Sequence, residues 1–288
     1  MTRTESLGRP VVRNRYGLAG VLATTALLAL AFVIVVPLIL PWFFVFKTKL
    51  EFAYHPWALP KSLLWDNFFT AWDNIQIGQG FVSTLLVCAG AILFSLPPSA
   101  LAGYVFAKYR SKVTEVLFYV ILVGYFVPIQ MVLIPLYRMN IQFGLIDTLP
   151  GIFLPMAAFN IPFWTLIYRS FFSSLPHDLA EAAQIDGAGH ARTFRQIMLP
   201  LAAPATMLAL ILVFIGAWSD YFLSLIMLNN QELFTMQLRV AQFLNGYGTD
   251  NMPQYAAAAV IATAPTLVLY ILGQRWILQG TLAGALKE

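Results

Sequence analysis

Residues 81–107 read FVSTLLVCAGAILFSLPPSALAGYVFA, a run without a single Asp, Glu, Lys or Arg. A membrane-spanning helix needs about 20 apolar residues, because each residue rises about 1.5 Å and the hydrocarbon core is about 30 Å thick. The sequence therefore predicts an all-α, polytopic membrane protein with six transmembrane helices. The other five predicted spans, in which Asp220 is the only Asp, Glu, Lys or Arg, are residues 18–46, 116–137, 148–168, 201–228 and 254–274.

The composition supports a membrane protein. Hydrophobic residues make up 59% of the chain and charged residues only 10%, whereas a soluble domain carries about 25% charged residues. This number of charged residues is too small to form a water-solvated surface. The bilayer must therefore be the main solvent. The formal net charge of +4 is too small to indicate nucleic-acid binding. Cys88 is the only cysteine, which excludes an intramolecular disulfide and a metal site made of several cysteines.

The 17 lysines and arginines are distributed unevenly between the two sides of the predicted spans. Most lie in residues 1–17, in the loop between the second and third spans, in residues 169–195 and in the tail. The positive-inside rule therefore places both termini in the cytoplasm. On this topology residues 1–17 are a cytoplasmic segment, residues 18–278 one transmembrane domain, and residues 279–288 a cytoplasmic tail. The first apolar segment is much longer than the core of a secretory signal, so we expect a retained helix.

The external loop, residues 47–80, is polar overall but rich in aromatic side chains, and Pro56 and Pro60 discourage a continuous helix through it. Two interpretations stay open. Either an extracytoplasmic partner docks on the aromatic side chains, or the loop folds as a cap in the headgroup region of the membrane. The aromatic residues are Trp57, Trp65, Phe68, Phe69 and Trp72.

The longest cytoplasmic loop, residues 173–200, reads SSLPHDLAEAAQIDGAGHARTFRQIMLP. The pattern predicts two short helices joined at Gly187, because glycine permits a backbone conformation that other residues avoid. Ser174 is a candidate cap for the first helix and Asp186 for the second. Glu181 lies near the start of the first helix, where the helix dipole favours a negative charge.

The second short helix of this loop has an apolar face, with Ala191, Phe194 and Ile197 at helical spacing. An amphipathic helix that projects into the cytoplasm needs a surface to cover its apolar face. We therefore expect this face to dock on a partner protein.

The same loop resembles the EAA motif of the permeases of ATP-driven (ABC-type) importers. The matching positions are Glu181, Ala182, Ala183, Asp186, Gly187, Ala188, Phe194, Ile197, Leu199, Pro200 and Pro204. The Asp-Gly-Ala form is similar to that of the carbohydrate branch, the maltose-type permeases. The chain departs from the family pattern at Ser219 and Val82, positions where the family often has Asn.

This resemblance implies that the chain is a permease subunit of a sugar importer, with an oligosaccharide as substrate, in the plasma (inner) membrane of a bacterium. It implies a heterodimer with a second, homologous permease, two cytoplasmic ATPase subunits and an extracytoplasmic sugar-binding protein. ATP and Mg²⁺ would be used by the ATPase, and no cofactor is expected on this chain. The residues expected to couple the permease to the ATPase are Glu181, Ala182, Ala183, Asp186, Gly187, Phe194, Ile197 and Pro200.

Motifs of catalysis and metal binding are missing from the sequence. No Gly-Lys dipeptide occurs, so the chain has no phosphate-binding loop of the G-x-x-x-x-G-K-[ST] kind. His55, His177 and His190 lack the spacing of metal ligands. We therefore expect that the chain is not an enzyme and holds no metal.

Candidate sugar contacts are polar and aromatic residues within the predicted spans. An intramembrane carboxylate such as Asp220 suggests a functional site, since carboxylates accept hydrogen bonds from hydroxyls while aromatic faces cover the apolar side of a sugar ring. The alternative is that Asp220 forms a structural hydrogen bond with a partner helix. The candidates for the substrate pathway are Asp220, Trp218, Tyr221, Phe222, Asn160 and Gln130.

Two alternatives to a sugar importer remain. A permease for another small polar solute, such as glycerol phosphate, would keep the class, although the lack of positive charge within the spans disfavours an anion. A proton-coupled secondary transporter would need intramembrane ionisable groups to carry the coupling ion, and Asp220 alone is a poor supply.

Overall fold

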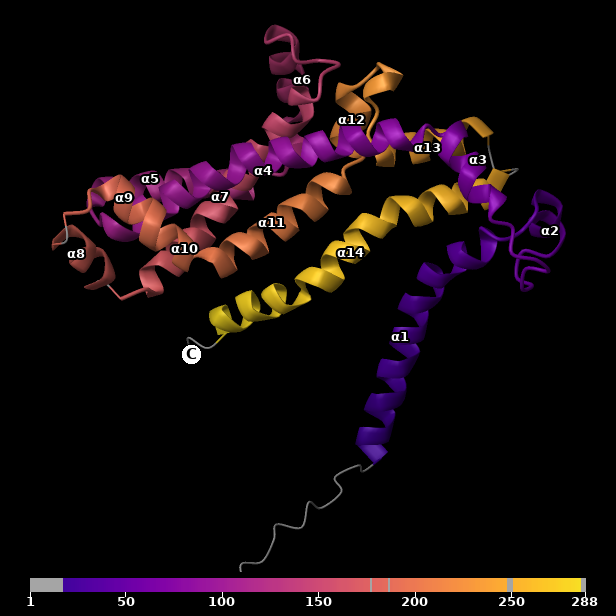
Figure 1. The fold of residues 1–288 in the computed structure, drawn as a ribbon, viewed down its shortest axis with the longest axis horizontal. Helices are drawn as coiled ribbons and strands as arrows, with labels where there is room; N and C mark the ends of the chain where they lie inside the picture. The colour runs from indigo at the N-terminus through magenta and orange to yellow at the C-terminus, as the bar shows by residue number, and fades with distance from the viewer. Residues whose placement is uncertain (1–17, 177, 186, 248–250, 286–288) are drawn as a thin grey trace, which may run out of the picture.

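The computed structural model describes residues 18–176, 178–185, 187–247 and 251–285. Helices and their connections account for all of these residues, and no strand occurs among them, so the predicted all-α fold is confirmed. The longest helices lie along one another in the body of the molecule, except for α1 (Figure 1). The five longest are α1 (Leu18–Phe44), α4 (Ile77–Lys108), α7 (Pro150–Ser174), α11 (Ala203–Trp218) and α14 (Met252–Ala285).

The predicted third span is broken instead of straight. Its two halves, Lys112–Phe126 and Ile129–Gln142, meet at an angle of 87°. Pro128 lies at the break and forces Val127 into an extended conformation (φ −89°, ψ 109°), because the ring of a proline disfavours a helical residue before it. The elements of this segment are α5 (Lys112–Val123), the 3-10 turns η1 (Gly124–Phe126) and η2 (Ile129–Val132), and α6 (Leu133–Gln142).

The predicted fifth span, residues 201–228, is also not one continuous helix. Helix α11 ends at Trp218, and a separate short helix, α12 (Phe222–Met227), follows it. At its other end α11 turns by 74° from the helical segment His190–Leu201. In the described part of the chain, four helices are long and apolar enough to cross a membrane, and the count reaches six when each bent pair is taken as one span.

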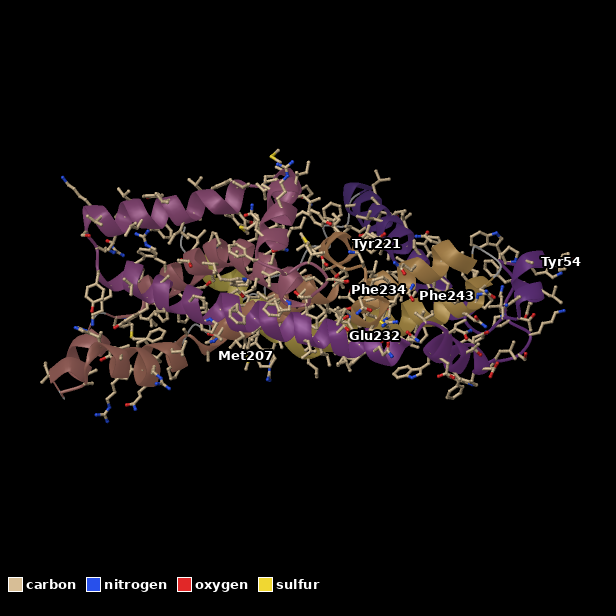
Figure 2. The ribbon with its side chains drawn as sticks, turned by 90° about the horizontal axis from the view of Figure 1, so that it is seen from above. Tyr54, Met207, Tyr221, Glu232, Phe234 and Phe243 are labelled. Atoms are coloured by element: carbon tan, nitrogen blue, oxygen red, sulfur yellow. The ribbon has the colours of Figure 1, made fainter. Side chains whose placement is uncertain are left out.

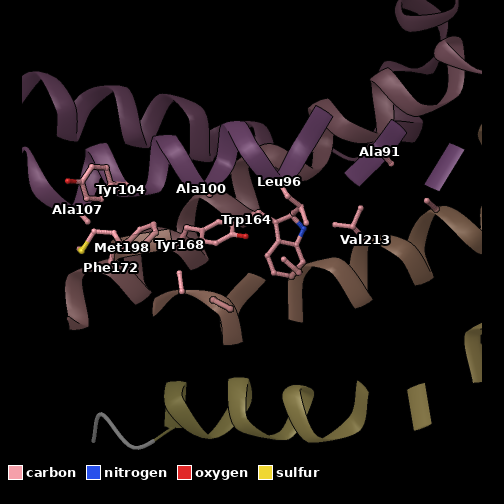
Figure 3. Packing of buried hydrophobic residues seen from close by; sticks show 14 of the residues in the cluster. Ala91, Leu96, Ala100, Tyr104, Ala107, Trp164, Tyr168, Phe172, Met198 and Val213 are labelled. Carbon is pink, nitrogen blue, oxygen red and sulfur yellow. The ribbon is translucent and has the colours of Figure 1, made fainter. Parts of the chain in front are cut away.

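Helices α4 and α7 approach closely at two glycines of α4. A Cβ on Gly90 would lie 2.4 Å from the Phe153 ring, and a Cβ on Gly103 would lie 2.5 Å from the Tyr168 Cβ and 2.8 Å from the backbone nitrogen of Arg169. Small residues at helix interfaces allow such an approach, which is how helices associate tightly in lipid. The largest core cluster forms along this contact and continues onto α11; Trp164, Tyr168 and Val213 are among its members (Figure 3).

Helix α1 extends away from this bundle (Figure 1). The C-terminal end of α1 packs against the start of α14. Most of the apolar side chains of α1, such as Leu27 and Phe32, are exposed. A helix that is apolar on every side requires lipid or another membrane protein around it.

The loop over residues 47–80 is folded. Lys47 is buried, and its ammonium group donates hydrogen bonds to the carbonyl oxygens of His55 (2.9 Å) and Pro56 (2.6 Å). The loop contains two helices, α2 (Lys49–Tyr54) and α3 (Asp66–Asn74), and Tyr54 marks its far end (Figure 2). Trp57 remains exposed on it, so a folded cap and a docking surface are both compatible with this arrangement.

A second folded segment covers the same end of the bundle. It consists of the 3-10 turn η4 (Gln231–Leu233) and helix α13 (Met236–Tyr247). Arg239 of α13 is buried, and its guanidinium group donates to the side-chain oxygens of Gln76 (2.9 Å) and Gln79 (3.0 Å). These bonds hold the start of α4 against α13. The remaining short elements, α8 (Asp178–Ile185), α9 (His190–Thr193), the π-helical turn η3 (Phe194–Met198) and α10 (Leu199–Leu201), lie at the opposite end of the bundle (Figure 1).

Candidate functional site

A pocket of about 400 Å³ lies beside the break between α11 and α12. Its walls come from the broken third segment, from α7 and from both sides of the break. The lining residues are Tyr125, Ile129, Gln130, Met156, Phe159, Asn160, Gly216, Ala217, Asp220, Phe222 and Leu223. Four of the six candidates for the substrate pathway, Gln130, Asn160, Asp220 and Phe222, therefore share one pocket although they belong to three separate segments.

Asp220 lies between α11 and α12 and caps the start of α12. One carboxylate oxygen accepts from the backbone N–H of Leu223 (3.3 Å), and the other accepts from the N–H of Ser224 (3.0 Å) and from its hydroxyl (2.9 Å). Acidic side chains commonly bond the free N–H groups at a helix start. The structural bonds of Asp220 thus go to the next helix of its own chain, and not to a distant helix.

The same carboxylate also faces the pocket. Each oxygen of an ionised carboxylate has two acceptor sites, so the capping bonds leave acceptor capacity for a ligand hydroxyl. The side-chain amide nitrogen of Asn160 donates to the carbonyl oxygen of Met156 at 2.8 Å. The side-chain oxygen of Asn160 is then a second acceptor in the pocket, beside the Asp220 carboxylate. Tyr125, Phe159 and Phe222 supply aromatic surface around these acceptors.

Two candidates do not line the pocket. Trp218 is completely buried; its indole N–H donates to the carbonyl oxygen of Ala262 at 2.8 Å, and its ring stacks on Phe214. It ties α11 to α14. Tyr221 is partly exposed and is absent from the pocket lining.

Sequence reasoning missed Tyr125, Met156 and Phe159 as pocket residues. Gly124 and Pro128 flank Tyr125 and are a usable signal, because glycine and proline mark positions where a helix can break. Met156 and Phe159 lie in α7 between Pro155 and Pro162, but a proline inside a helix does not show which neighbouring side chains line a pocket.

The cytoplasmic loop forms two short helical segments joined at Gly187, as predicted. Gly187 has a φ of +77°, a left-handed conformation that favours glycine. The N–H of Ala188 closes the first helix by donating to the carbonyl oxygen of Ala183 at 2.9 Å. Ser174 does not cap α8; it is the last residue of α7, and its hydroxyl donates to the carbonyl oxygen of Phe171.

The coupling candidates differ in their placement. Ala183 is buried, Pro200 is exposed, and Gly187 is exposed at the turn. Glu181 and Ala182 belong to α8, but their side chains lie outside the described ones, and Asp186 lies outside the described residues altogether.

Part of the apolar face of the second segment packs on the chain itself: Phe194 and Ile197 are half-buried, whereas Ala191 is exposed. The Phe194 ring lies 5.1 Å from the ring of Tyr104 and 6.4 Å from that of Phe172, measured between ring centres. Ile197 packs on the same core cluster, and Met198 is buried in it. A helix of this length on the edge of a bundle buries its apolar residues against the nearest apolar surface, which here is its own α4 and α7.

Among the residues that the structure describes, no group of three or more His, Cys, Asp or Glu side chains is placed to hold a metal ion.

These features define a multi-helix membrane protein with a polar pocket between broken helices and a helix–turn–helix loop at one end. Residues 99–282 match the family of binding-protein-dependent transport system inner membrane components, and the chain belongs to this family. Members of this family are membrane components of transporters and not enzymes. The match of residues 99–282 to the family confirms the resemblance of the chain to importer permeases.

Individual relatives agree with the family. The diacetylchitobiose uptake system permease protein NgcG of Streptomyces coelicolor is 32% identical over 246 residues, covering 85% of this chain and 82% of the relative. The melibiose/raffinose/stachyose import permease protein MelC of Bacillus subtilis is 31% identical over 233 residues, covering 80% and 84%. A chain of the crystal structure of a bacterial ABC transporter involved in the import of alginate has the same fold, with a TM-score of 0.80 at 20% identity over 93% of this chain and 99% of that one.

Proposed function

We propose that this chain forms half of the solute pathway of an ATP-driven, binding-protein-dependent importer of neutral oligosaccharides. The pocket that joins Gln130, Asn160 and Asp220 to three aromatic rings carries this proposal. Amide and carboxylate oxygens accept hydrogen bonds from sugar hydroxyls, while the rings of Tyr125 and Phe222 suit the apolar faces of a sugar.

The charge of the pocket favours a neutral substrate. Asp220 contributes a carboxylate, and no Lys or Arg is among the residues that line the pocket. An acidic sugar or glycerol phosphate would bring a second negative charge into the same space without a cation to balance it. The relatives NgcG and MelC are named for diacetylchitobiose and for melibiose, raffinose and stachyose, whereas the transporter that shares the fold at 20% identity is involved in the import of the acidic polysaccharide alginate.

The loop between α7 and α11 supplies the proposed link to the ATPase. In this proposal α8 docks on an ATPase subunit, with Glu181 as the carboxylate that pairs with a basic residue of that subunit. Ala182, Ala183, Asp186, Gly187 and the exposed Pro200 shape the docking element, while Phe194 and Ile197 fix it to the bundle. Closure of two ATPase subunits on ATP would then move the loops as rigid bodies and switch the pathway between its two faces.

The remaining partners complete the importer. A second, homologous permease would supply the other half of the pathway, and an extracytoplasmic sugar-binding protein would deliver the substrate to the end that carries α2, α3 and α13. The loop would then face the cytoplasm, together with both termini. On this arrangement α1 is surrounded by lipid and the partner permease.

Uptake into cells tests the proposal directly. Cells with the intact gene should accumulate radiolabelled neutral oligosaccharides such as raffinose, and cells without it should not. Depleting ATP should stop uptake, whereas collapsing the proton gradient with ATP kept intact should not. Uptake that stops with the proton gradient alone would favour a secondary transporter, and preferential uptake of glycerol phosphate or an acidic sugar would refute the neutral-sugar assignment.

A further inference from the structure

A second, smaller cavity of about 140 Å³ lies between the end of α4 and the loop that joins α7 to α11. It shares no residue with the proposed sugar pocket. Figure 3 shows Tyr104, Ala107, Phe172 and Met198 gathered at one end of the core cluster, where this cavity lies. The lining residues are Tyr104, Ala107, Lys108, Phe172, Leu175, Pro176, Ala180 and Met198.

Two donors in this cavity lack a hydrogen-bond partner among the described residues. The Tyr104 side chain is 3% exposed, and neither its hydroxyl nor the buried ammonium group of Lys108 bonds to any group in the described part of the chain. The two donors are neighbours, since the Lys108 Nζ lies 6.0 Å from the centre of the Tyr104 ring. Buried polar groups are almost always paired, and a buried ammonium group needs a negative partner.

Two described charged side chains on nearby elements have partners outside the cavity. Glu115 of α5 forms an ion pair with Arg169, so its carboxylate is already neutralised. Arg110 donates to the hydroxyl of Ser173 at 3.4 Å. The other residues that line the cavity contribute apolar side chains or Cβ atoms, so the site offers a positive charge and a neutral donor at the end of an apolar space.

We propose that this cavity binds a phosphate group, with the Lys108 ammonium group and the Tyr104 hydroxyl as its two donors. The oxygens of a phosphate accept several charge-assisted hydrogen bonds, and the group supplies the missing negative charge. Lys108 is the last residue of the long apolar helix α4, and Arg110 and Lys112 follow it directly. Basic pockets where membrane helices end are typical binding sites for the head groups of anionic phospholipids.

Occupation of this site would affect the loop. Ala180 of α8 and Met198 of η3 form part of its wall, opposite Tyr104 and Lys108 of α4. A bound phosphate would therefore brace both short helices of the loop against the bundle. The site would make the position of the loop depend on anionic lipid or on free phosphate.

Native mass spectrometry of the full-length chain, purified in a neutral detergent, provides the test. The chain is titrated with dioleoylphosphatidylglycerol, with dioleoylphosphatidylcholine and with inorganic phosphate. We expect one tight site for phosphatidylglycerol, with a Kd about tenfold or more weaker in Lys108→Gln and in Tyr104→Phe. Lys108→Arg keeps the charge and should retain the site. Lys112→Gln, a change of the same kind on an exposed neighbour, should bind as the wild type does.

The outcomes separate the sources of the phosphate. Tight binding of phosphatidylglycerol alone identifies a lipid site, and tight binding of inorganic phosphate identifies a site for the free anion. Equal affinities in the wild type and Tyr104→Phe, a variant that preserves the shape of the side chain, would overturn the proposal. Binding that emerges only after Glu181→Gln or Asp178→Asn would show that a carboxylate of α8 fills the cavity, and would overturn it as well.

Discussion

Asp220 caps a helix and is also the carboxylate of the proposed sugar pocket. Its oxygens cap α12 through Leu223 and Ser224, and the same carboxylate lines the pocket beside Asn160. The cap explains why the chain breaks here: a carboxylate that bonds to backbone N–H groups ahead of it competes with a continuous helix. The break in turn opens the pocket.

Asp220→Asn tests whether the carboxylate contacts the sugar. Asparagine is a good capping residue but keeps only one of the two acceptor oxygens that Asp220 uses, so the thermal midpoint of the purified protein should fall only modestly. The loss of a charge-assisted acceptor, worth about 1.5 to 3 kcal/mol, should raise the KM for uptake about tenfold or more. Tyr221→Phe, one residue further along but outside the pocket, serves as the control and should leave KM unchanged. An unaltered KM in Asp220→Asn would reduce Asp220 to a helix cap.

At the scale of the elements, the contact between α4 and α7 depends on glycine. Gly103 has no room for a Cβ, because Tyr168 and the backbone of Arg169 occupy its position. The helices can approach only because the side chain is missing, and the core aromatics Tyr104 and Phe172 then meet across the contact, with ring centres 5.7 Å apart.

We expect Gly103→Ala to destabilise the protein by about 1 to 3 kcal/mol, because the helices must separate to admit one methyl group. Gly246→Ala makes the same chemical change in α13, where a Cβ would meet nothing within 4 Å. It should be neutral or slightly stabilising, since alanine favours a helix more than glycine does. Thermal unfolding of the two variants in the same detergent compares them, and equal midpoints would contradict the packing argument.

The cytoplasmic loop offers a second matched pair of glycines. Gly187 has a φ of +77°, whereas Gly189 has an ordinary φ of −67°, and a Cβ would meet nothing within 4 Å at either position. Valine at position 187 is therefore strained by the backbone alone, at a cost on the order of 1 kcal/mol or more, and the angle between α8 and α9 should change. Valine at position 189 carries no such strain.

If the loop couples the permease to the ATPase, Gly187→Val should still insert in the membrane but co-purify poorly with the ATPase and lose transport. Gly189→Val should keep both properties. Co-purification and sugar-stimulated ATP hydrolysis in reconstituted membranes measure the difference. Full, sugar-coupled hydrolysis by Gly187→Val would exclude the loop angle as a coupling element.

At the scale of the whole molecule, the two folded loops lie at opposite ends of the bundle (Figure 1). The segments with α2, α3 and α13 cover one end, and the α8–α9 loop covers the other. Loops at opposite ends of membrane-spanning helices face opposite sides of the membrane, which agrees with the uneven distribution of basic residues in the sequence.

Cysteine labelling tests this topology in intact cells. After Cys88, which is buried, is replaced by Ala, single cysteines are introduced at three exposed positions: Ser62, Ser111 and Gln196. A membrane-impermeant maleimide added outside should label Ser62→Cys only. Ser111→Cys and Gln196→Cys should react only in inverted vesicles. Labelling of Gln196→Cys from outside would reverse the proposed orientation.

The sequence by itself determined the local properties of this protein. Runs of apolar residues predicted the helices, the glycine at position 187 predicted the left-handed turn of the loop, and the residues around it indicated the family. Such features depend on neighbouring positions along the chain, because apolar length, helical periodicity and backbone freedom are set within a few turns.

The tertiary structure alone decided which residues meet. Gln130, Asn160 and Asp220 share a pocket because three separate segments pack around two helix breaks. Trp218 and Phe222 are both aromatic residues in the sequence, but the indole N–H of Trp218 donates to the carbonyl oxygen of Ala262 and holds Trp218 in the core. Met198 is buried in the chain's own core, and Phe194 packs partly against it. The polarity of a residue does not predict whether its side chain lies in the core or in the pocket, because this depends on which helix packs beside it.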